Sequence, residues 1–464
     1  MGLRAQRLFG LPKAYAFALS EAASALATLL TDSDDPQSFE RPRRRRVRAR
    51  TVKVEVVRGA HLAKFDADWR DLAARADSPN VFMQPRVLRA AEGGRPIVAL
   101  LAFEPHGDGR RLVGFWAFSV GTPHLSLVPI TALCAPATEH AYLSAPVIDS
   151  ERLEVTLHAM LDAIAAAPDL PKLVALESMS GSGATYEALL RVLGARMSRH
   201  CCLDAKMRPT LLRRADAVLS IENLLSSGSR KKLRQHRRRL GEKGRLETTV
   251  VHAVADVQRA FEAVLLLEAK GWKGRRGTAM LCDPQIAAFA RSLVTSLARA
   301  GDAAIYALEL DGRPISMQVV LRAGAAAFTW KTAYDEGFSE FSPGVLLFED
   351  YTRALLADPG VALIDSCAYD DTGYMAAWSD RQEVIDLWID AQRGGSAAFA
   401  AAVCLQKVYL PLRETAKHAV ARSGNLETLA RSALALLRSK QTRNASAAAP
   451  AKTRSAANGL VRAT

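Results

Sequence analysis

The 464-residue sequence is poor in cysteine, and its cysteines form no metal-binding or disulfide pattern. There are six of them, and no two stand in a Cys-x-x-Cys pair or at a Cys/His ligand spacing. Neither a disulfide framework nor a zinc site is expected, and no metal is predicted. Unpaired thiols fit a reducing compartment, so the predicted location is cytoplasmic.

Long apolar runs are also missing, since no stretch reaches 18 apolar residues in a row. A membrane-spanning helix is therefore not predicted. The apolar residues 14–19 follow basic residues as in a signal peptide, but Ser20 and Glu21 cut the run short. The composition, 49% hydrophobic and 24% charged, is that of a soluble globular protein, and the length predicts two domains plus tails.

Positive charge is concentrated in three segments, although the chain as a whole carries a net charge of +14. Lys and Arg outnumber Asp and Glu by ten to five in residues 1–50, by nine to one in 226–245 and by nine to one in 415–464. The two basic tails predict weak association with an anionic membrane surface. The alternative interpretation is that they are solvated, disordered ends. Nucleic acid is not an expected partner, because the basic run has no interleaved aromatic residues.

Alternation and helical periodicity divide the chain into two α/β halves between basic tails. We predict a disordered segment 1–50, lobes at 51–204 and 205–420, and a helical then disordered tail 421–464. Strands are predicted at 51–57, 96–103, 112–120, 173–177, 209–213, 246–252, 303–310, 315–322, 325–331, 362–365 and 383–388, with a strand or turn at 217–221. Helices are predicted at 62–76, 151–167, 184–193, 226–243, 256–270, 284–300, 345–357 and 395–420. The order predicts mixed, mainly antiparallel sheets flanked by helices, a fold of the α/β (α+β) class.

The stretch 330–347, WKTAYDEGFSEFSPGVLL, combines the end of a strand, a polar loop and the start of a helix. Ser342 is typical of an N-cap, and Pro343 suits the first helical position because it has no N–H to leave unpaired. Gly344 lets a ligand approach the backbone closely. Free amides and the helix dipole make such a terminus a predicted phosphate site, although many Ser-Pro helix starts bind nothing.

Four motifs together resemble a known family of enzymes. They are Glu268…Gly271-Trp272-Lys273-Gly274…Gly277-Thr278-Ala279, Ile305 to Gly312 with the Asp311-Gly312 hairpin, Trp330 to Asp335, and Ser342 to Leu347. This arrangement resembles the GNAT-fold acetyltransferases associated with bacterial cellulose and exopolysaccharide biosynthesis (CelD/BcsL-type), which are related to tandem-GNAT Fem-like transferases. The resemblance covers about 205–415 and extends more weakly into the first half.

The resemblance implies two GNAT-like lobes, the second of which holds an acyl-CoA cleft. Acetyl-CoA would be the co-substrate, and the amides of Ser342, Gly344 and Val345 would hold its pyrophosphate. Lys331 would contact a phosphate or a sugar carboxylate. The general Arg/Gln-x-x-Gly-x-Gly/Ala pattern of the superfamily is absent, because residues 340–345 contain one glycine.

Acyl transfer needs a base, a proton donor and groups that position the acceptor. The candidate base is Asp335 or Glu336, the candidate acid is Tyr334 or Tyr369, and Asp365 ends the next strand. The predicted substrate contacts are Glu268, Trp272, Lys273 and Trp330, of which Lys273 lies on a predicted loop flanked by glycines. The competing interpretation makes the acidic residues loop charges and the aromatic residues part of the core.

Three functions are compatible with these features. The first is an acyl-CoA-dependent acyltransferase acting on an amine or hydroxyl of a sugar or polysaccharide-related acceptor. The second is a Fem-like aminoacyl transferase, for which the basic helix 226–243 would contact tRNA, although no coiled-coil arm is apparent. The third is a non-catalytic adaptor at a membrane surface, held by the basic segments.

Overall fold

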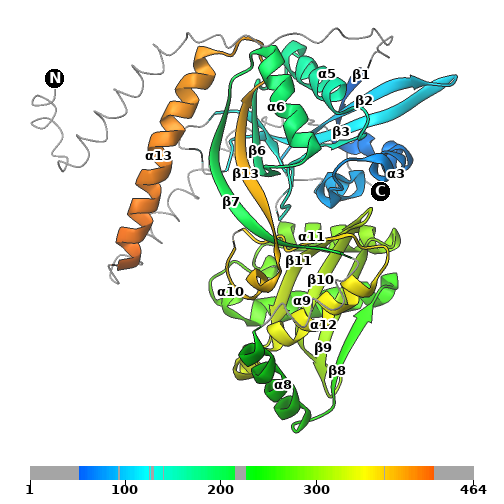
Figure 1. The fold of residues 1–464 in the computed structure, drawn as a ribbon, viewed down its shortest axis with the longest axis vertical. Coiled ribbons are helices and arrows are strands. Elements are labelled where there is room, and N and C mark those ends of the chain that lie inside the picture. Colours follow the sequence, from blue (N-terminus) through cyan, green and yellow to red (C-terminus); the bar gives the residue numbers. More distant parts are fainter. Residues whose placement is uncertain are drawn as a thin grey trace, which may run out of the picture. The chain divides into compact units, whose positions relative to one another are not determined.

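One thirteen-stranded sheet joins the two halves of the described chain in the computed structural model (Figure 1). The structure describes residues 52–91, 95–124, 126, 130–138, 140–214, 226–369 and 371–422. The strand order is β1-β2-β3-β4-β6-β13-β7-β12-β11-β10-β9-β8, and the short β5 pairs with β3. The described residues up to 403 form one compact unit, while α13 beyond residue 403 belongs to a second unit.

The N-terminal half contains four antiparallel strands, β1 to β4, followed by the parallel pair β4 and β6. Its strands are β1 (Lys53–Arg58), β2 (Ile97–His106), β3 (Gly109–Gly121), β4 (Ala132–Ala135), β5 (Val147–Ile148), β6 (Leu173–Ser180) and β7 (His200–Leu212). Its helices are η1 (Gly59–Phe65), α3 (Asp66–Arg75), η2 (Val81–Met83), α4 (Pro85–Ala90), α5 (Leu153–Ala166) and α6 (Ala184–Arg196).

The C-terminal half repeats this order, with antiparallel β8 to β11 followed by the parallel pair β11 and β12. Its strands are β8 (Leu246–Val251), β9 (Ala303–Leu310), β10 (Arg313–Ala323), β11 (Ala326–Tyr334), β12 (Leu363–Asp365) and β13 (Asp380–Asp390). Its helices are α8 (Ser227–Gly241), α9 (Val254–Lys270), α10 (Trp272–Arg275), η3 (Met280–Cys282), α11 (Pro284–Arg299), η4 (Glu336–Phe341), α12 (Pro343–Ala357), η5 (Tyr374–Ala377) and α13 (Ala397–Arg422).

Strand exchange holds the two halves in one sheet. β13 leaves the C-terminal half and inserts between β6 and β7, antiparallel to both, as the orange strand in Figure 1 shows. β7 in turn runs past β13 and pairs with β12 through residues 210–212. Each half therefore supplies strands to the other, and loops from the N-terminal half can reach the C-terminal half.

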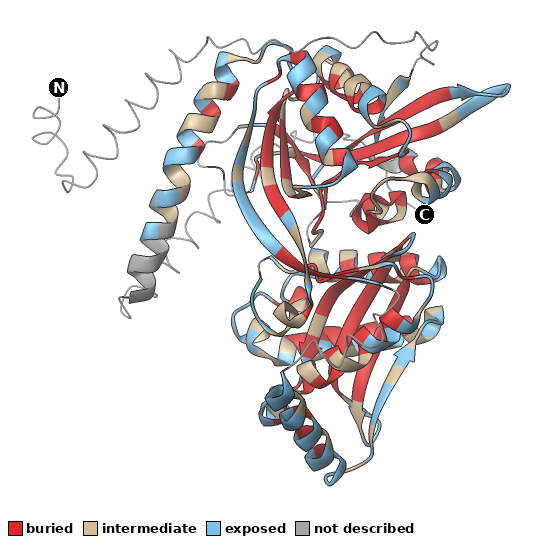
Figure 2. Cartoon of the chain, in the orientation of Figure 1, coloured by how far each residue is buried: buried red, intermediate tan, exposed pale blue. Residues whose placement is uncertain are grey.

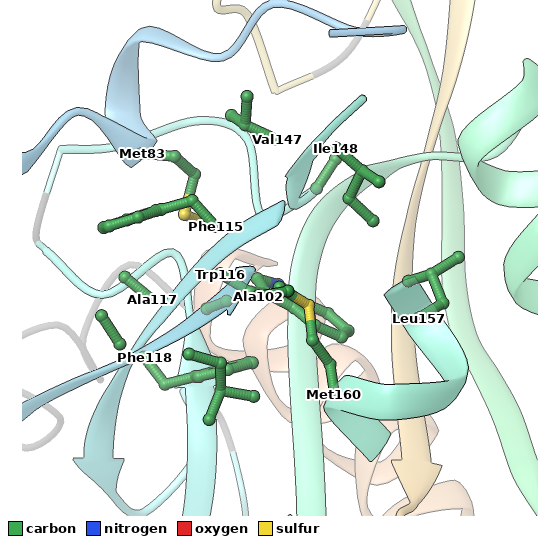
Figure 3. Close-up of a cluster of buried hydrophobic side chains, with 14 of the residues drawn as sticks. Met83, Ala102, Phe115, Trp116, Ala117, Phe118, Val147, Ile148, Leu157 and Met160 are labelled. Atoms are coloured by element: carbon green, nitrogen blue, oxygen red, sulfur yellow. The ribbon is translucent and has the colours of Figure 1, made fainter. Parts of the chain in front are cut away.

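The core of the N-terminal half packs α5 against β2 and β3. Figure 3 shows Leu157 and Met160 of α5 among the side chains around Trp116 and Ala102, and all four are buried. Gly114 of β3 makes this close packing possible, because a Cβ there would overlap Cγ2 of Thr156 and lie 2.8 Å from Cε of Met160.

Two separate cores cover the two faces of the C-terminal half, where buried residues line the strands (Figure 2). α9 and α11 cover one face, with Phe261 and Leu293 packed on Phe328 and Trp330. α8 and α12 cover the other face, with Leu240 and Leu347 packed near Ala327. α11 begins where Asp283 caps the amides of residues 285 and 286, and Pro284 occupies the first position.

The predicted fold class, an α/β fold with a mixed, mainly antiparallel sheet and flanking helices, is confirmed. β7 and β13 are longer than predicted, because residues 200–208 of β7 pair with residues 382–389 of β13, and residues 380–382 pair with residues 208–210. The Gly-flanked loop predicted around Lys273 is instead the short helix α10. The predicted segment 217–221 and the tails 1–50 and 423–464 lie outside the described residues, and the lobe boundaries stay a prediction. No described helix is both long and apolar enough to cross a bilayer.

Replacing Gly114 by alanine should destabilise the N-terminal half by about 1–3 kcal/mol, because the new methyl group overpacks the contact between α5 and β3. The additional change Thr156→Ser removes the overlapping Cγ2 and should restore at least half of the loss. Denaturant unfolding of both variants measures the two effects.

Gly194→Ala is the matched control. Gly194 lies in α6, with no atom within 4 Å of a Cβ placed there. This change should leave stability unchanged or raise it by about 0.4–1 kcal/mol, through the lower entropy of the unfolded chain. Equal losses for Gly114→Ala and Gly194→Ala would contradict the steric explanation.

Candidate active site

A β-bulge in β11 marks the centre of the candidate site. β11 pairs in parallel with β12 only from Ala326 to Phe328, and beyond that point the two strands part. On its other side the register with β10 shifts, so that Trp330 has no partner of its own. Gln318 fixes the bulge because its Nε2 donates to the carbonyl of Lys331 at 3.0 Å. The side chains of Trp330 and Lys331 therefore lie where the sheet opens.

Lys331 is buried in a cluster formed with the N-terminal half. Its Nζ lies 2.9 Å from the hydroxyl of Tyr142 and 3.0 Å from Nδ1 of His140. The indole N–H of Trp330 donates to the carbonyl of His140 at 2.7 Å. Residues about 190 positions apart in sequence thus share one polar cluster, in which the Lys331 residue is 8% exposed.

Side-chain donors hold the segment from His140 to Ala145 by its carbonyl groups. The donors come from four residues on separate elements: Asn80 to the carbonyls of residues 143 and 145, Trp116 to 144, Arg208 to 142 and Trp330 to 140. A segment without regular structure leaves its carbonyls unpaired unless such donors satisfy them. The clamped backbone fixes His140 in a left-handed conformation, with a φ of 58°.

Burial shapes the charges of this cluster. Burial and the charge of Lys273 lower the pKa of Lys331 from 10.5 to about 8. Burial and the charge of Lys331 lower the pKa of His140 from 6.5 to about 4. At neutral pH the cluster therefore combines a neutral imidazole with a lysine that is mostly protonated.

Glu268 and Lys273 lie close to this cluster. The charge of Glu268 raises the pKa of both His140 and Lys331, and the charge of Lys273 lowers the pKa of both. Glu268 is buried at the end of α9, where its Oε1 accepts from Nζ of Lys273 at 2.8 Å and its Oε2 accepts from the amide of Met280 at 2.9 Å. The predicted substrate residues Glu268, Lys273 and Trp330 are thus brought together with Lys331. Trp330 itself is buried, with its ring stacked on Phe261, so it offers no exposed face for a sugar or adenine.

The fourth predicted substrate residue, Trp272, lies apart from the buried cluster and is half exposed. The guanidinium of Arg276 lies 5.2 Å from the centre of its ring. Its amide donates to Glu336, which also accepts from Arg275. Glu336 therefore ties α10 to the end of β11.

Asp335 is held by two cations and an amide. Its Oδ2 accepts from Lys270 at 3.0 Å and from Arg313 at 2.9 Å, and its Oδ1 caps η4 through the amide of Gly337. Burial alone would raise the pKa of Asp335, but the hydrogen bond from Lys270, the Gly337 amide and the nearby charges outweigh it and keep the pKa below its usual value. Such a carboxylate is a weak proton acceptor.

The other two predicted catalytic residues differ in exposure. Asp365 is buried, accepts from the amide of Cys367 at 2.7 Å and lies 3.6 Å from Arg208, so it organises the chain after β12. Tyr334 is exposed at the end of β11. It lines a cavity of about 180 Å³ together with Leu267, Lys270, Gly271, Arg275, Asp335, Glu336 and Gly337. Tyr369, the alternative acid, is also exposed and packs edge-on against Tyr142.

The start of α12 differs in detail from the predicted phosphate site. Ser342 stands at the N-cap position, but its φ is 51° and its side chain caps no amide. The amide of Ser342 donates to Ser339, and the amide of Val345 donates back to Ser342. Gly344 has open space around its Cα, since a Cβ there would meet no atom within 4 Å. Of the three predicted amides, Gly344 is the one best placed for a ligand.

The structure does not bring Lys331 together with the start of α12. Lys331 contacts Trp330 and Tyr142 on the face covered by α9 and α11, whereas α12 covers the opposite face. His140, Tyr142 and Arg208 were not predicted as site residues from the sequence. One signal was present: no element was predicted between residues 120 and 151, and a long segment without regular structure inside a domain is commonly functional.

The described chain thus combines a two-halved α/β fold with a buried polar cluster shared by both halves, and comparison with known proteins indicates its class. Residues 227–374 match the family model described as "Acetyltransferase (GNAT) domain". No curated protein matches the chain. The C-terminal half therefore carries a GNAT-type acetyltransferase domain, and the predicted acyltransferase is confirmed at this level. The match implies acyl-CoA as the co-substrate.

Solved structures with a similar fold include the following three. The crystal structure of FemX shares 13% sequence identity over 72% of this chain and 96% of that chain, with a TM-score of 0.48. The C-terminal domain of a putative lysylphosphatidylglycerol synthetase from Agrobacterium fabrum shares 15% over 75% and 95%, with a TM-score of 0.43. A tandem GNAT protein from the clavulanic acid biosynthesis pathway shares 16% over 74% and 100%, with a TM-score of 0.39.

The depressed pKa of Lys331 predicts a pH-dependent stability. Between pH 8 and 10.5 the folded protein has released a proton that the unfolded chain keeps, so stability rises with pH in this window. The contribution is about 3 kcal/mol, at about 1.4 kcal/mol per pKa unit. Denaturant unfolding at pH 7.5 and 10.5 should therefore show the wild type gaining this amount relative to Lys331→Met.

Lys232→Met, at an exposed position on α8, is the control for this measurement. Its unfolding free energy should follow that of the wild type at both pH values. If Lys331→Met also follows the wild type, the ammonium group of Lys331 is not desolvated as described.

Proposed function

We propose that this protein transfers an acyl group, most simply acetyl, from acyl-CoA to an amine or hydroxyl of a sugar or polysaccharide-related acceptor. The observation that carries the proposal is the buried polar cluster of His140, Tyr142 and Lys331 at the point where β11 and β12 part, within an acetyltransferase domain. Hydrogen-bond donors buried beside a sheet opening suit the polar groups of bound substrates. A role in cellulose or exopolysaccharide biosynthesis and a cytoplasmic location belong to the same proposal.

The donor side of the proposed site is the start of α12. A helix of 15 residues has unpaired amides and a positive dipole end at its N-terminus, both of which favour the CoA pyrophosphate. Gly344 supplies open space and an amide there. The basic helix α8 packs against the same region, since His236 lies edge-on to Phe341 and Arg237 pairs with Asp350 of α12. Its cations add to the attraction for the phosphates of CoA.

The acceptor side of the proposed site is the cavity at the end of β11. Two cations and two carboxylates, Lys270, Arg275, Asp335 and Glu336, line it together with Tyr334. Alternating charges of this kind suit hydroxyl-rich ligands, which both donate and accept hydrogen bonds. Trp272, exposed on α10, offers an aromatic surface for a sugar ring.

For proton transfer we propose Tyr334 as the acid that protonates the departing thiolate. It is the accessible member of the predicted catalytic set, whereas Asp335 and Asp365 are buried and paired. Asp335 would act by positioning, because it holds the loop after β11 through Lys270 and Gly337. Asp365 would position the chain beyond β12 in the same way.

A second candidate is aminoacyl transfer from tRNA, which the exposed cations of α8 favour. Leu233, His236 and Leu240 are buried against the C-terminal half, so the remaining face is exposed. That face carries Lys231, Lys232, Arg234, Arg238 and Arg239. More cations than one CoA phosphate group requires would suit a longer polyanion. A membrane surface is the corresponding anionic partner for the adaptor hypothesis.

Gly344→Asp should weaken acetyl-CoA binding by about tenfold or more. A carboxylate at the N-terminus of α12 would repel the pyrophosphate and occupy the favourable end of the dipole, an effect of about 1–2 kcal/mol, and 1.4 kcal/mol is a factor of ten. Calorimetric titration with acetyl-CoA measures the change.

Ala354→Asp is the control, because it adds the same charge at an exposed position farther along α12. It should bind acetyl-CoA as the wild type does. Equal binding by Gly344→Asp and Ala354→Asp would remove the pyrophosphate from this helix start. No binding of acetyl-CoA by the wild type, combined with binding of tRNA, would favour aminoacyl transfer.

Tyr334→Phe should lower kcat by about 100-fold, since general acids typically contribute between 10² and 10⁴. The thiolate would then take its proton from water. Tyr369→Phe serves as the comparison, because Tyr369 is the other exposed tyrosine considered for this role. Steady-state kinetics with release of free CoA gives both values. A larger loss in Tyr369→Phe than in Tyr334→Phe would reverse the assignment.

A further inference from the structure

The Nε2 atom of His140 is a buried polar atom that the fold leaves unused. It is shielded from solvent and has no hydrogen-bond partner among the residues that the structure describes. Buried polar atoms are nearly always paired, so an unpaired one beside a site is available to a ligand or a water. His140 comes from the N-terminal half, yet its imidazole and carbonyl contact Lys331 and Trp330 of the acetyltransferase domain.

The contact with Lys331 decides which nitrogen of His140 carries the proton. The pKa of Lys331, about 8, leaves this group mostly protonated at neutral pH, and the pKa of His140, about 4, leaves the imidazole neutral. A protonated Lys331 can only donate, so Nδ1 of His140 must accept at 3.0 Å. The proton of the neutral ring then sits on Nε2, and the unused group is an N–H donor.

The position of this donor is fixed by backbone contacts. Trp330 and Arg208 donate to the carbonyls of residues 140 and 142, and the left-handed backbone at His140 turns the ring toward Lys331. Lys331 stands at the bulge where β11 and β12 separate. A donor held rigidly before the ligand arrives needs no reorganisation during the reaction.

We infer that Nε2–H of His140 donates a hydrogen bond to the oxyanion that forms on the thioester carbonyl during acyl transfer. The N-terminal half therefore completes the active site of the C-terminal half with a catalytic group. Lys331 is the positioning residue, because it holds the tautomer and polarises the ring. The inference rests on the proposed function, since it requires a thioester substrate.

The step balances without an added reagent. The acceptor nitrogen or oxygen forms a bond to the carbonyl carbon, and the π electrons of the carbonyl move to oxygen, which His140 stabilises. When the carbonyl re-forms, the carbon–sulfur bond breaks and its electrons leave with the CoA thiolate. The proton lost by the acceptor goes to solvent, and the thiolate takes one from the acid or from solvent. His140 transfers no proton.

Two substitutions test the role of His140. His140→Ala removes the donor and should lower kcat by about 10²–10³-fold, the loss typical of one oxyanion donor, with KM changed less than about threefold. His140→Gln keeps an N–H₂ donor near the position of Nε2 and should remain within about tenfold of the wild type. Acetyl-CoA binding, measured by calorimetry, should be the same in all three proteins, because the oxyanion exists only in the transition state.

The pH profile gives a second readout that a structural role would not produce. The charged and titratable groups around Lys331 are His140, Tyr142, Glu268, Lys273 and Cys367. Above about pH 8 Lys331 loses its proton and can accept from Nδ1–H, so Nε2 loses its hydrogen and kcat should fall. In His140→Gln the donor no longer depends on Lys331, and the fall above pH 8 should disappear.

Several outcomes would overturn the inference. Equal losses in His140→Ala and His140→Gln would make His140 a proton acceptor instead. A rise in KM with unchanged kcat would assign Nε2–H to a carboxylate or phosphate of the bound acceptor. Wild-type activity in His140→Ala would leave the proposed function intact and remove His140 from it. If His140→Ala does not fold, the rate and the pH profile of His140→Gln still test the role of His140. A wild type without acetyl-CoA turnover would overturn the proposed function itself.

Discussion

The insertion of β13 between β6 and β7 is the constraint on which the rest of the structure depends. Its backbone pairs with strands of the N-terminal half on both sides, although the chain reaches it from the C-terminal half. Backbone hydrogen bonds along a whole strand fix register as well as proximity. The segment 140–145 therefore lies in a fixed position beside β11. There the neutral side chains of His140 and Tyr142 contact the buried Lys331.

Lys331 can be buried only because hydrogen-bonding partners are buried beside it. A charged amine inside a protein is costly unless donors and acceptors surround it. Lys331 has Tyr142, His140 and the charge of Glu268 nearby, and its pKa still falls to about 8. The side-chain donors that pair with the carbonyls of the 140–145 segment also orient His140. Stability and the geometry of the candidate site are thus produced by one set of contacts.

The sequence predicted features that depend on neighbouring residues. Period-two alternation located the strands, the Asp311-Gly312 turn located the β9–β10 hairpin, and Pro343 located the start of α12. It could not predict contacts that depend on strand exchange, because His140 and Lys331 are 191 residues apart. Lys273 appeared to lie on a loop because glycines flank it, yet residues Trp272–Arg275 form the short helix α10. From the sequence, Asp335 appeared to be an unpaired loop acid. Its ion pairs with Lys270 and Arg313 could not be predicted, because both cations come from other elements.

The sharing of one polar cluster between the halves couples a substitution in one half to the environment of residues in the other. A substitution at residue 331 alters the environment of residues 140 and 142, which lie outside the segment that matches the acetyltransferase domain. On the inference that His140 is catalytic, the C-terminal half would need the N-terminal half for its chemistry. In a fusion of this acetyltransferase domain to a different N-terminal partner, Lys331 would lack its contact with His140.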